Sequence, residues 1–285
     1  MILLAILLLA APLHAAGPHV IVVGLDGCSP DGIRKADHPT FQQLMKEGAW
    51  TMKARGVMPT VSSPNWASMI MGAGPEQHGI TSNDWQPAKF EFPANFLGPK
   101  GIFPTMFGLL REQQPSARIA IFHDWEGFGR LVEPGVASII GHPKGPRQTM
   151  AEAIAEWKEH QPTLLFIHLD HIDHAGHEEG HGTPAYYESV REAGRLIAQL
   201  REAIGAAKVH LIVTSDHGGK GKKHGGNTLE ELEIPWLIAG PGVRPGHEIQ
   251  ATVNTYDTAA TVAYILQLKT PQAWIGRPVR EAFGK

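Results

Sequence analysis

A short apolar run that ends in an acid, a histidine and a glycine pair is the feature that most constrains the fold of this chain. The run covers residues 209–214, is rich in β-branched side chains, and is followed directly by Ser215, Asp216, His217 and two glycines. A run of this length and composition, closed by glycine, predicts a buried strand. Because open α/β sheets bind their ligands at the carboxyl ends of strands, the run puts a carboxylate and an imidazole at such an edge.

Two further apolar runs end in the same kinds of side chain. One precedes Asp26, and the other, residues 163–169, precedes an acid- and histidine-rich segment at residues 170–177. His224 follows His217 inside a second glycine pair, where the backbone can fold closely around a small ligand. The carboxyl ends of parallel strands share one edge of a sheet, so we expect these groups to converge. A mixed set of carboxylates and imidazoles suits zinc, with manganese and iron as alternatives.

The apolar residues alternate between strand-like and helix-like spacing along the chain. Strands are expected at residues 19–25, 50–57, 117–122, 163–169, 209–214 and 234–239. Helices are expected at residues 39–47, 65–71, 103–113, 147–160, 183–204 and 256–268. This order predicts an α/β fold with a mostly parallel central sheet and helices on both faces. We interpret residues 17–285 as a single domain.

The start of the chain predicts export. Residues 1–16 are an apolar run followed by small residues, which is typical of a signal peptide. Its cleavage would leave a periplasmic or secreted protein without stable membrane insertion, and the alternative is an uncleaved N-terminal anchor. The single cysteine, Cys28, excludes an internal disulfide and is expected to be buried. The net charge of −3 gives no electrostatic footprint for nucleic acid.

Six short motifs occur along the chain in a characteristic order. They are the strand-terminal Asp26, PTVSSPN at residues 59–65, GAGPEQHGITSN at residues 72–83, the segment at residues 173–180, SDHG at residues 215–218, and His224-Gly225. In this order and spacing the chain resembles the alkaline phosphatase superfamily, and within it the nucleotide pyrophosphatase/phosphodiesterase branch. The resemblance covers most of residues 19–280 and implies an alkaline phosphatase-like fold.

The resemblance also implies two divalent metal ions, with zinc preferred, and a serine nucleophile. The first ion would be held by Asp26, Asp216, His217 and Ser62. The second ion would be held by Asp173, His177 and His224. Ser62 would be the nucleophile as well as a ligand, and Asn83 would bind the phosphoryl oxygen beside it.

The implied ligand set balances the charge of two metal ions. Three carboxylates and a serine alkoxide carry −4 against +4 from two Zn²⁺, so the site is formally neutral and can admit an anionic phosphate. Metal coordination would also activate the serine, which is a weak nucleophile on its own. The expected partner is therefore a small-molecule phosphoester, and no nucleic acid binding is expected.

Some assignments in these motifs have a competing interpretation. Thr60 is the second candidate nucleophile. Ser63 is expected to cap a helix that has Pro64 at its first position. His78 and His168 are expected to be structural rather than functional.

The histidine-rich segment offers two acid–histidine pairs with the same spacing. Asp170 and His174 are four residues apart, as are Asp173 and His177, so spacing alone does not distinguish the two pairs. Only the second pair is in register with the glycines of the family motif. We therefore prefer Asp173 and His177 as the ligands.

These observations predict an exported two-metal hydrolase that cleaves phosphodiester or pyrophosphate bonds through a phosphoryl-enzyme intermediate on Ser62. A phosphomonoesterase, phosphonate hydrolase or sulfatase of the same superfamily is the alternative enzyme, and a non-catalytic exported metal-binding protein is the alternative of another class. Residues 59–71 contain no Arg or Lys, which favours a singly charged diester over a doubly charged monoester.

One departure from the family concerns base recognition. Nucleotide-hydrolysing members usually carry an aromatic residue directly after the nucleophile, and this chain has Ser63 there. The aromatic residues that could substitute are Trp66, Trp85, Trp125 and Phe128.

Overall fold

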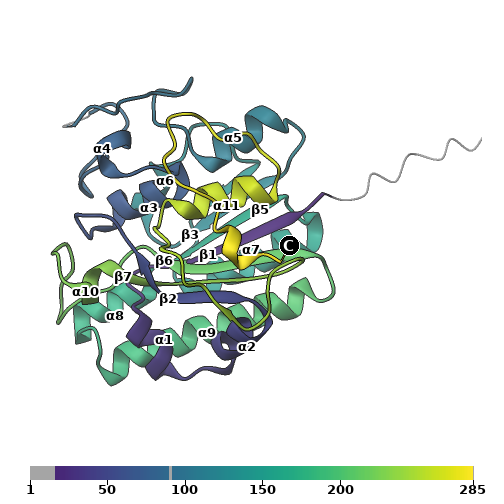
Figure 1. The fold of residues 1–285 in the computed structure, drawn as a ribbon. Coiled ribbons are helices and arrows are strands. Elements are labelled where there is room, and N and C mark those ends of the chain that lie inside the picture. The colour runs from purple at the N-terminus through teal and green to yellow at the C-terminus, as the bar shows by residue number, and fades with distance from the viewer. Residues whose placement is uncertain (1–16, 90–91, 285) are drawn as a thin grey trace, which may run out of the picture.

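The structure is a computed structural model that describes residues 17–89 and 92–284, and its centre is a single sheet of eight strands. The strand order is β4-β3-β5-β1-β6-β7-β2-β8, so β1 lies in the middle (Figure 1). The strands are β1 His19–Leu25, β2 Ala49–Arg55, β3 Ile119–His123, β4 Ile139–Gly141, β5 Leu164–Leu169, β6 Val209–Ser215, β7 Glu233–Ala239 and β8 His247–Glu248. The expected export segment, residues 1–16, lies outside the described residues.

The prediction of a mostly parallel sheet is confirmed. Parallel pairing joins β4, β3, β5, β1 and β6, and β7 alone runs antiparallel to its neighbours β6 and β2. The long connection after β6 leaves and returns at the same edge of the sheet, so β7 must run back beside β6. That connection carries Asp216, His217 and His224.

Helices cover both faces of the sheet, as predicted (Figure 1). One face carries α3 Ser62–Met71, α4 Pro75–His78, α5 Met106–Gln113, α6 Glu126–Gly129 and α11 Asp257–Ile265. The other face carries α1 Pro30–Ala36, α2 Pro39–Glu47, α7 Pro146–His160, α8 His171–Glu179 and α9 Pro184–Ile204. The short α10 Leu229–Leu232 precedes β7, and a 3₁₀ turn, Arg280–Ala282, lies near the C-terminus. Among the described residues, no helix is both long and apolar enough to cross a membrane.

The two helical layers explain why the central strands are continuously apolar. Val20 and Val22 of β1 belong to one buried cluster, while Ile21 and Val23 belong to the cluster on the opposite face. Successive side chains of a strand point to opposite faces, so a strand covered on both faces must be apolar at every position. Because both faces are buried, the ends of the central strands are held in place. The side chains that directly follow these strands are positioned in the same way.

The start of α3 corrects the expectation for Ser63. The helix begins at Ser62 rather than after Ser63, its N-cap is Val61, and no side chain caps it. The hydroxyl of Ser63 is buried and has no hydrogen-bond partner among the described residues. The expectation that Ser63 caps the helix was wrong because the helix starts at Ser62, two residues before the proline that was expected at its first position.

Gly24 of β1 gives a test of how tightly α3 packs on the sheet. A Cβ atom at this position would lie 2.4 Å from Cη2 of Trp66. We expect Gly24→Ala to lower the free energy of unfolding by about 1–3 kcal/mol, because this part of the core cannot accept another methyl group. Chemical denaturation would measure the change. Gly17→Ala is the control, since nothing lies within 4 Å of its Cβ position; equal stability of the two variants would contradict this packing.

Candidate metal centre

The register of the sheet brings the predicted ligands of the first metal to one point. Leu25 pairs with Leu169 on one side and with Ser215 on the other, so the three central strands end level with one another. Asp26 directly follows β1, and its N–H donates to the carbonyl of Leu169 over 2.9 Å. Asp216 directly follows β6. The backbone pairing of the strands therefore positions the carboxylates of Asp26 and Asp216.

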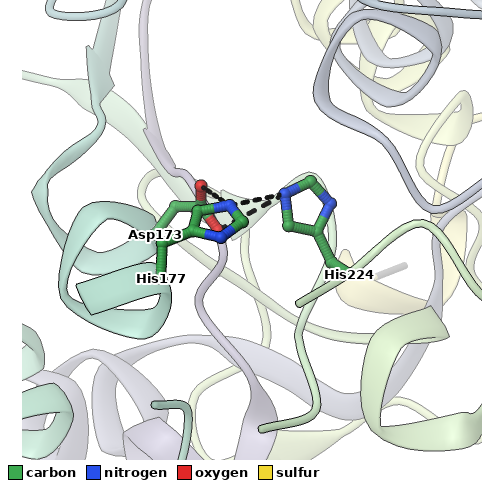
Figure 2. Close-up of side chains that lie close together, drawn as sticks. All are labelled: Asp173, His177 and His224. Carbon is green, nitrogen blue, oxygen red and sulfur yellow. Dashed lines mark hydrogen bonds and ion pairs between the residues drawn. The ribbon is translucent and has the colours of Figure 1, made fainter. Parts of the chain in front are cut away.

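Helix α8 delivers the next pair of ligands. Asp173 and His177 lie one turn apart on this helix, and Asp173 Oδ2 is 3.2 Å from His177 Nε2. His224, from the loop after β6, completes a group whose ligand atoms all lie within 4.8 Å of one another. Figure 2 shows the His177 ring between the Asp173 carboxylate and the His224 ring, with the two imidazoles turned toward each other. The competing pair does not form such a group: among the described residues His174 belongs to no ligand group, whereas Asp170 joins Asp26 and His168 in a separate one.

The predicted ligands of the first metal surround His217. His217 Nε2 lies 3.4 Å from Asp26 Oδ1, 3.2 Å from Asp216 Oδ2 and 3.2 Å from the hydroxyl of Ser62. Asp173 also joins Asp26 and His217 in a group within 4.8 Å. The two predicted ligand sets are therefore adjacent parts of one cluster. It runs from the fully buried His217 to His177, whose side chain is 44% exposed.

Backbone carbonyls fix the tautomer of all three histidines. Nδ1 of His217 lies 2.8 Å from the carbonyl of Gly218, Nδ1 of His224 lies 2.8 Å from that of Thr60, and Nδ1 of His177 lies 3.0 Å from that of Lys222. A carbonyl oxygen only accepts, so each Nδ1 must carry the proton. Each Nε2 then presents its lone pair to the cluster, as metal-binding histidines do.

These lone pairs repel one another unless a positive species lies between them. His224 Nε2 and His177 Nε2 are 3.1 Å apart, and each ring has already used its N–H on a carbonyl (Figure 2). A shared proton or a metal ion resolves the contact. The hydrogen bond to Asp173 raises the pKa of His177 to about 9, so without a metal ion a proton on His177 occupies this contact.

The three carboxylates also require a positive charge close to them. One oxygen of each, Asp26 Oδ1, Asp173 Oδ1 and Asp216 Oδ2, is buried with no hydrogen-bond partner among the described residues. Burial, and then the charge of Asp173, raises the pKa of Asp26 to about 8. Burial and the charges of Asp26 and Asp173 raise the pKa of Asp216 well above its usual value. Buried, unpaired carboxylate oxygens beside the Nε2 atoms of three imidazoles fit divalent metal ions.

The remaining carboxylate oxygens are held in place by donors. Asp26 Oδ2 lies 3.0 Å from Nε1 of Trp66, which donates to it, and 3.1 Å from Nε2 of His168. Asp216 Oδ1 accepts a hydrogen bond from the N–H of Gly27 over 3.1 Å. Each carboxylate is thus oriented so that its free oxygen faces the cluster. His168 was expected to be structural, and its contact with Asp26 was missed; the available signal was one imidazole inside an otherwise apolar strand.

Ser62 and Thr60 differ in what their hydroxyls contact. Ser62 lies at the first position of α3 and faces His217, as given above. Thr60 Oγ1 instead donates to the carbonyl of Gly226 over 2.8 Å and accepts from the N–H of Gly225 over 3.0 Å. Thr60 therefore anchors the loop that carries His224, and only Ser62 presents its hydroxyl to the cluster.

Asn83 lies beside the start of α3. Its Oδ1 accepts a hydrogen bond from the backbone N–H of Ser63 over 2.8 Å. Because the oxygen of the amide is committed, its NH₂ group is the part left to donate to a ligand.

Most aromatic residues considered for base stacking belong to the core. Trp66 and Phe128 are completely buried, and Trp85 is 5% exposed. Trp125 is the only one of the four that is half-buried rather than buried. Substitution by Trp66 or Phe128 is excluded because their rings are covered on all sides.

Comparisons with known proteins identify a family whose model covers these residues. The model of the type I phosphodiesterase / nucleotide pyrophosphatase family matches residues 20–97 and 123–233, which include every predicted ligand, Ser62 and Asn83. An uncharacterized pyrophosphatase/phosphodiesterase of Schizosaccharomyces pombe is 25% identical over 216 residues, covering 70% of this chain and 44% of that protein. The chain spans between 24% and 50% of the length of the other curated relatives that it matches.

Solved structures show the same fold at low sequence identity. Inactive murine ectonucleotide pyrophosphatase/phosphodiesterase 5 in complex with AMP superposes with a TM-score of 0.77 at 17% identity, covering 94% of this chain and all of that one. A mutant of the alkaline phosphatase PafA superposes with a TM-score of 0.78 at 12% identity over the same share of both chains. The prediction of an alkaline phosphatase-like fold is confirmed.

The two acid–histidine pairs of the α8 region can be separated by metal analysis. We expect Asp173→Ala and His177→Ala each to lose one metal ion per chain, because both side chains face His224. His174→Ala is the matched control and should keep the full content, since its side chain is exposed on the same helix. Elemental analysis of purified protein would decide. Loss of metal from His174→Ala, with retention in His177→Ala, would show that the other pair binds.

Proposed function

The chain belongs to the type I phosphodiesterase / nucleotide pyrophosphatase family, and from this premise we propose that it is an exported two-metal hydrolase of phosphodiester or pyrophosphate bonds, with Ser62 as its nucleophile. The observation that carries the proposal is the convergence of three Nε2 lone pairs and three unpaired carboxylate oxygens beside one serine hydroxyl. A non-catalytic metal-binding protein has no use for that hydroxyl.

The proposed ligands form two sets. Asp26, Asp216, His217 and Ser62 would hold one ion, and Asp173, His177 and His224 would hold the other. Bound there, the ions would lower the pKa of the serine hydroxyl and neutralise charge on the phosphoryl group. Zinc is the proposed metal because the six ligands other than Ser62 are three imidazoles and three carboxylates. Zinc commonly binds both kinds of group.

The proposed reaction is an in-line displacement by Ser62. Its oxygen would form a bond to phosphorus while the bond from phosphorus to the leaving oxygen breaks, which gives a phosphoryl-enzyme intermediate. Water would then attack phosphorus, break the bond to Ser62 and release the phosphorylated product. The start of α3 favours negative charge at Ser62, because the unpaired N–H groups of a helix N-terminus carry partial positive charge. The NH₂ group of Asn83, beside the N–H of Ser63, is the proposed donor to an unbridged phosphoryl oxygen.

Export is supported by sequence and by relatives. Residues 1–16 read as a signal peptide, and the murine protein with the same fold is named an ectonucleotide pyrophosphatase/phosphodiesterase. We propose a periplasmic or secreted location for the mature chain.

Adjacent serines give a direct test of the nucleophile. We expect Ser62→Ala to lower kcat/KM for an aryl phosphodiester by roughly 10³-fold or more, because the hydroxyl of Ser62 contacts His217 whereas that of the other candidate, Thr60, is bound to the loop backbone. The matched control is Ser63→Ala, whose hydroxyl is buried without a partner and should be dispensable for turnover. Steady-state kinetics and metal content should be measured for both. A fully active Ser62→Ala variant that still binds metal would overturn the role of Ser62.

A substrate panel tests which ester is cut. A formally neutral cluster with one amide donor suits a singly charged diester, so we expect a bis-aryl phosphate to be hydrolysed with a kcat/KM above that of the aryl monophosphate and of the aryl sulfate. The three substrates share one leaving group, so their ratio reports the phosphoryl or sulfuryl group alone. If the monophosphate or the sulfate were preferred, the diesterase assignment would be wrong, whereas the two-metal site would stand.

A further inference from the structure

The three carboxylates of the cluster differ in what orients them. Asp26 and Asp216 each accept a hydrogen bond from a group outside the proposed metal sites, the indole of Trp66 and a backbone N–H respectively. Those donors remain whether or not an ion is bound. Asp173 has a single hydrogen-bond donor among the described residues, Nε2 of His177, which lies 3.2 Å from its Oδ2 (Figure 2).

Metal binding would remove the only donor to Asp173. His177 is proposed to bind the second ion through Nε2, because its Nδ1 lies against the carbonyl of Lys222. A ring nitrogen that binds a metal has no proton to donate. Carboxylates that bind metals are usually held by hydrogen bonds from residues outside the site. The loaded site therefore requires a further donor to Asp173.

His181, which follows α8, lies where that donor is needed. Its Nε2 is 3.9 Å from Oδ1 of Asp173, and its side chain is only 3% exposed. Both of its ring nitrogens are buried without a hydrogen-bond partner, and so is Oδ1 of Asp173. Among the described histidines, no other has two such nitrogens. A buried donor without an acceptor is costly, so this ring points to a bond that forms in another state of the site.

Two glycines hold the His181 ring beside Asp173. A Cβ atom at Gly176 of α8 would lie 2.3 Å from Nε2 of His181, and one at Gly219 would lie 2.1 Å from the same atom. The ring therefore occupies a slot that is open only because both neighbours lack a side chain. In contrast to the three proposed ligand histidines, no carbonyl holds a proton on Nδ1 of His181 among the described residues. Its Nε2 is thus free to carry the proton.

We propose that His181 is a positioning residue for the second metal ion, whose Nε2–H donates to Asp173 once the ion has displaced the proton of His177. The separation of 3.9 Å exceeds a hydrogen bond by about 1 Å. Loss of the bond from His177 frees the carboxylate to turn by that amount. The inference rests on the proposed second ligand set and adds the residue that determines how tightly that ion is held.

Two substitutions at His181 separate donation from space filling. His181→Leu fills much of the slot without a donor, whereas His181→Gln keeps an N–H group at a similar distance from the backbone. The matched control is His210→Leu. This variant also removes an imidazole that is buried, but at the start of β6, at the opposite end of the strand from Asp216.

The experiment titrates zinc into each purified variant against a competing chelator and records Tm alongside. We expect His181→Leu to weaken the binding of one of the two ions roughly 10- to 100-fold, whereas His181→Gln stays within about threefold of the wild type. His210→Leu should leave the affinities for both ions unchanged. Diester turnover by His181→Leu should fall at limiting zinc and return with excess zinc, because Ser62 and all six other ligands are intact.

Several outcomes would overturn the inference. Wild-type affinity for both ions in His181→Leu, or an equal weakening in His181→Leu and His181→Gln, would show that the ring only fills its slot. A turnover loss that excess zinc does not restore would overturn it as well, as would a wild-type protein that binds a single ion. Failure of the proposed hydrolase would look different: two ions would be bound with the expected affinities, and no diester would be cleaved.

Discussion

Three carboxylates share one buried volume at the ends of β1 and β6 and on α8, and their mutual repulsion is the constraint on which the site depends. Asp26 and Asp216 are almost completely buried, and Asp173 is only 8% exposed. Burial acts to raise the pKa of Asp173, but the hydrogen bond from His177 and the nearby imidazoles lower it to about 2. Burial and the neighbouring carboxylates outweigh the hydrogen bonds of Asp26 and Asp216, so the pKa values of these two groups rise. Only cations among the three oxygens make the arrangement favourable.

The loop after β6 connects the cluster to elements that are distant in the sequence. His224 on the loop bonds to the carbonyl of Thr60 before α3, and the carbonyl of Lys222 accepts from His177 on α8. The carbonyl of Gly221 accepts from the N–H of His181, which follows α8. The nucleophile segment, the loop and α8 are therefore held together by the hydrogen bonds that also set the imidazole tautomers. Any change in one of them is expected to alter how the others present their lone pairs.

The sequence predicts what the sheet determines and misses what depends on long-range side-chain contacts. Asp26 and Asp216 could be placed because apolar strands covered on both faces end where the first polar residue appears. Helix α8 was not expected as a helix, because residues 171–179 contain few apolar residues and show no helical period. The contact of His168 with Asp26, and that of Arg130 with Asn83, join residues far apart in the chain, and no local pattern encodes them.

The aromatic residues near Ser62 mostly pack around the cluster. Trp66 is completely buried, packs on His168 at 4.6 Å between ring centres, and donates to Asp26. Its ring therefore positions a metal ligand and is not available to a base. Trp125 is half-buried and lies beside the guanidinium of Arg130. With Ser63 next to the nucleophile in place of an aromatic residue, the contacts that remain are an amide, a guanidinium and the cluster itself. We therefore expect the charge of the phosphoryl group to matter more for recognition than a stacked ring.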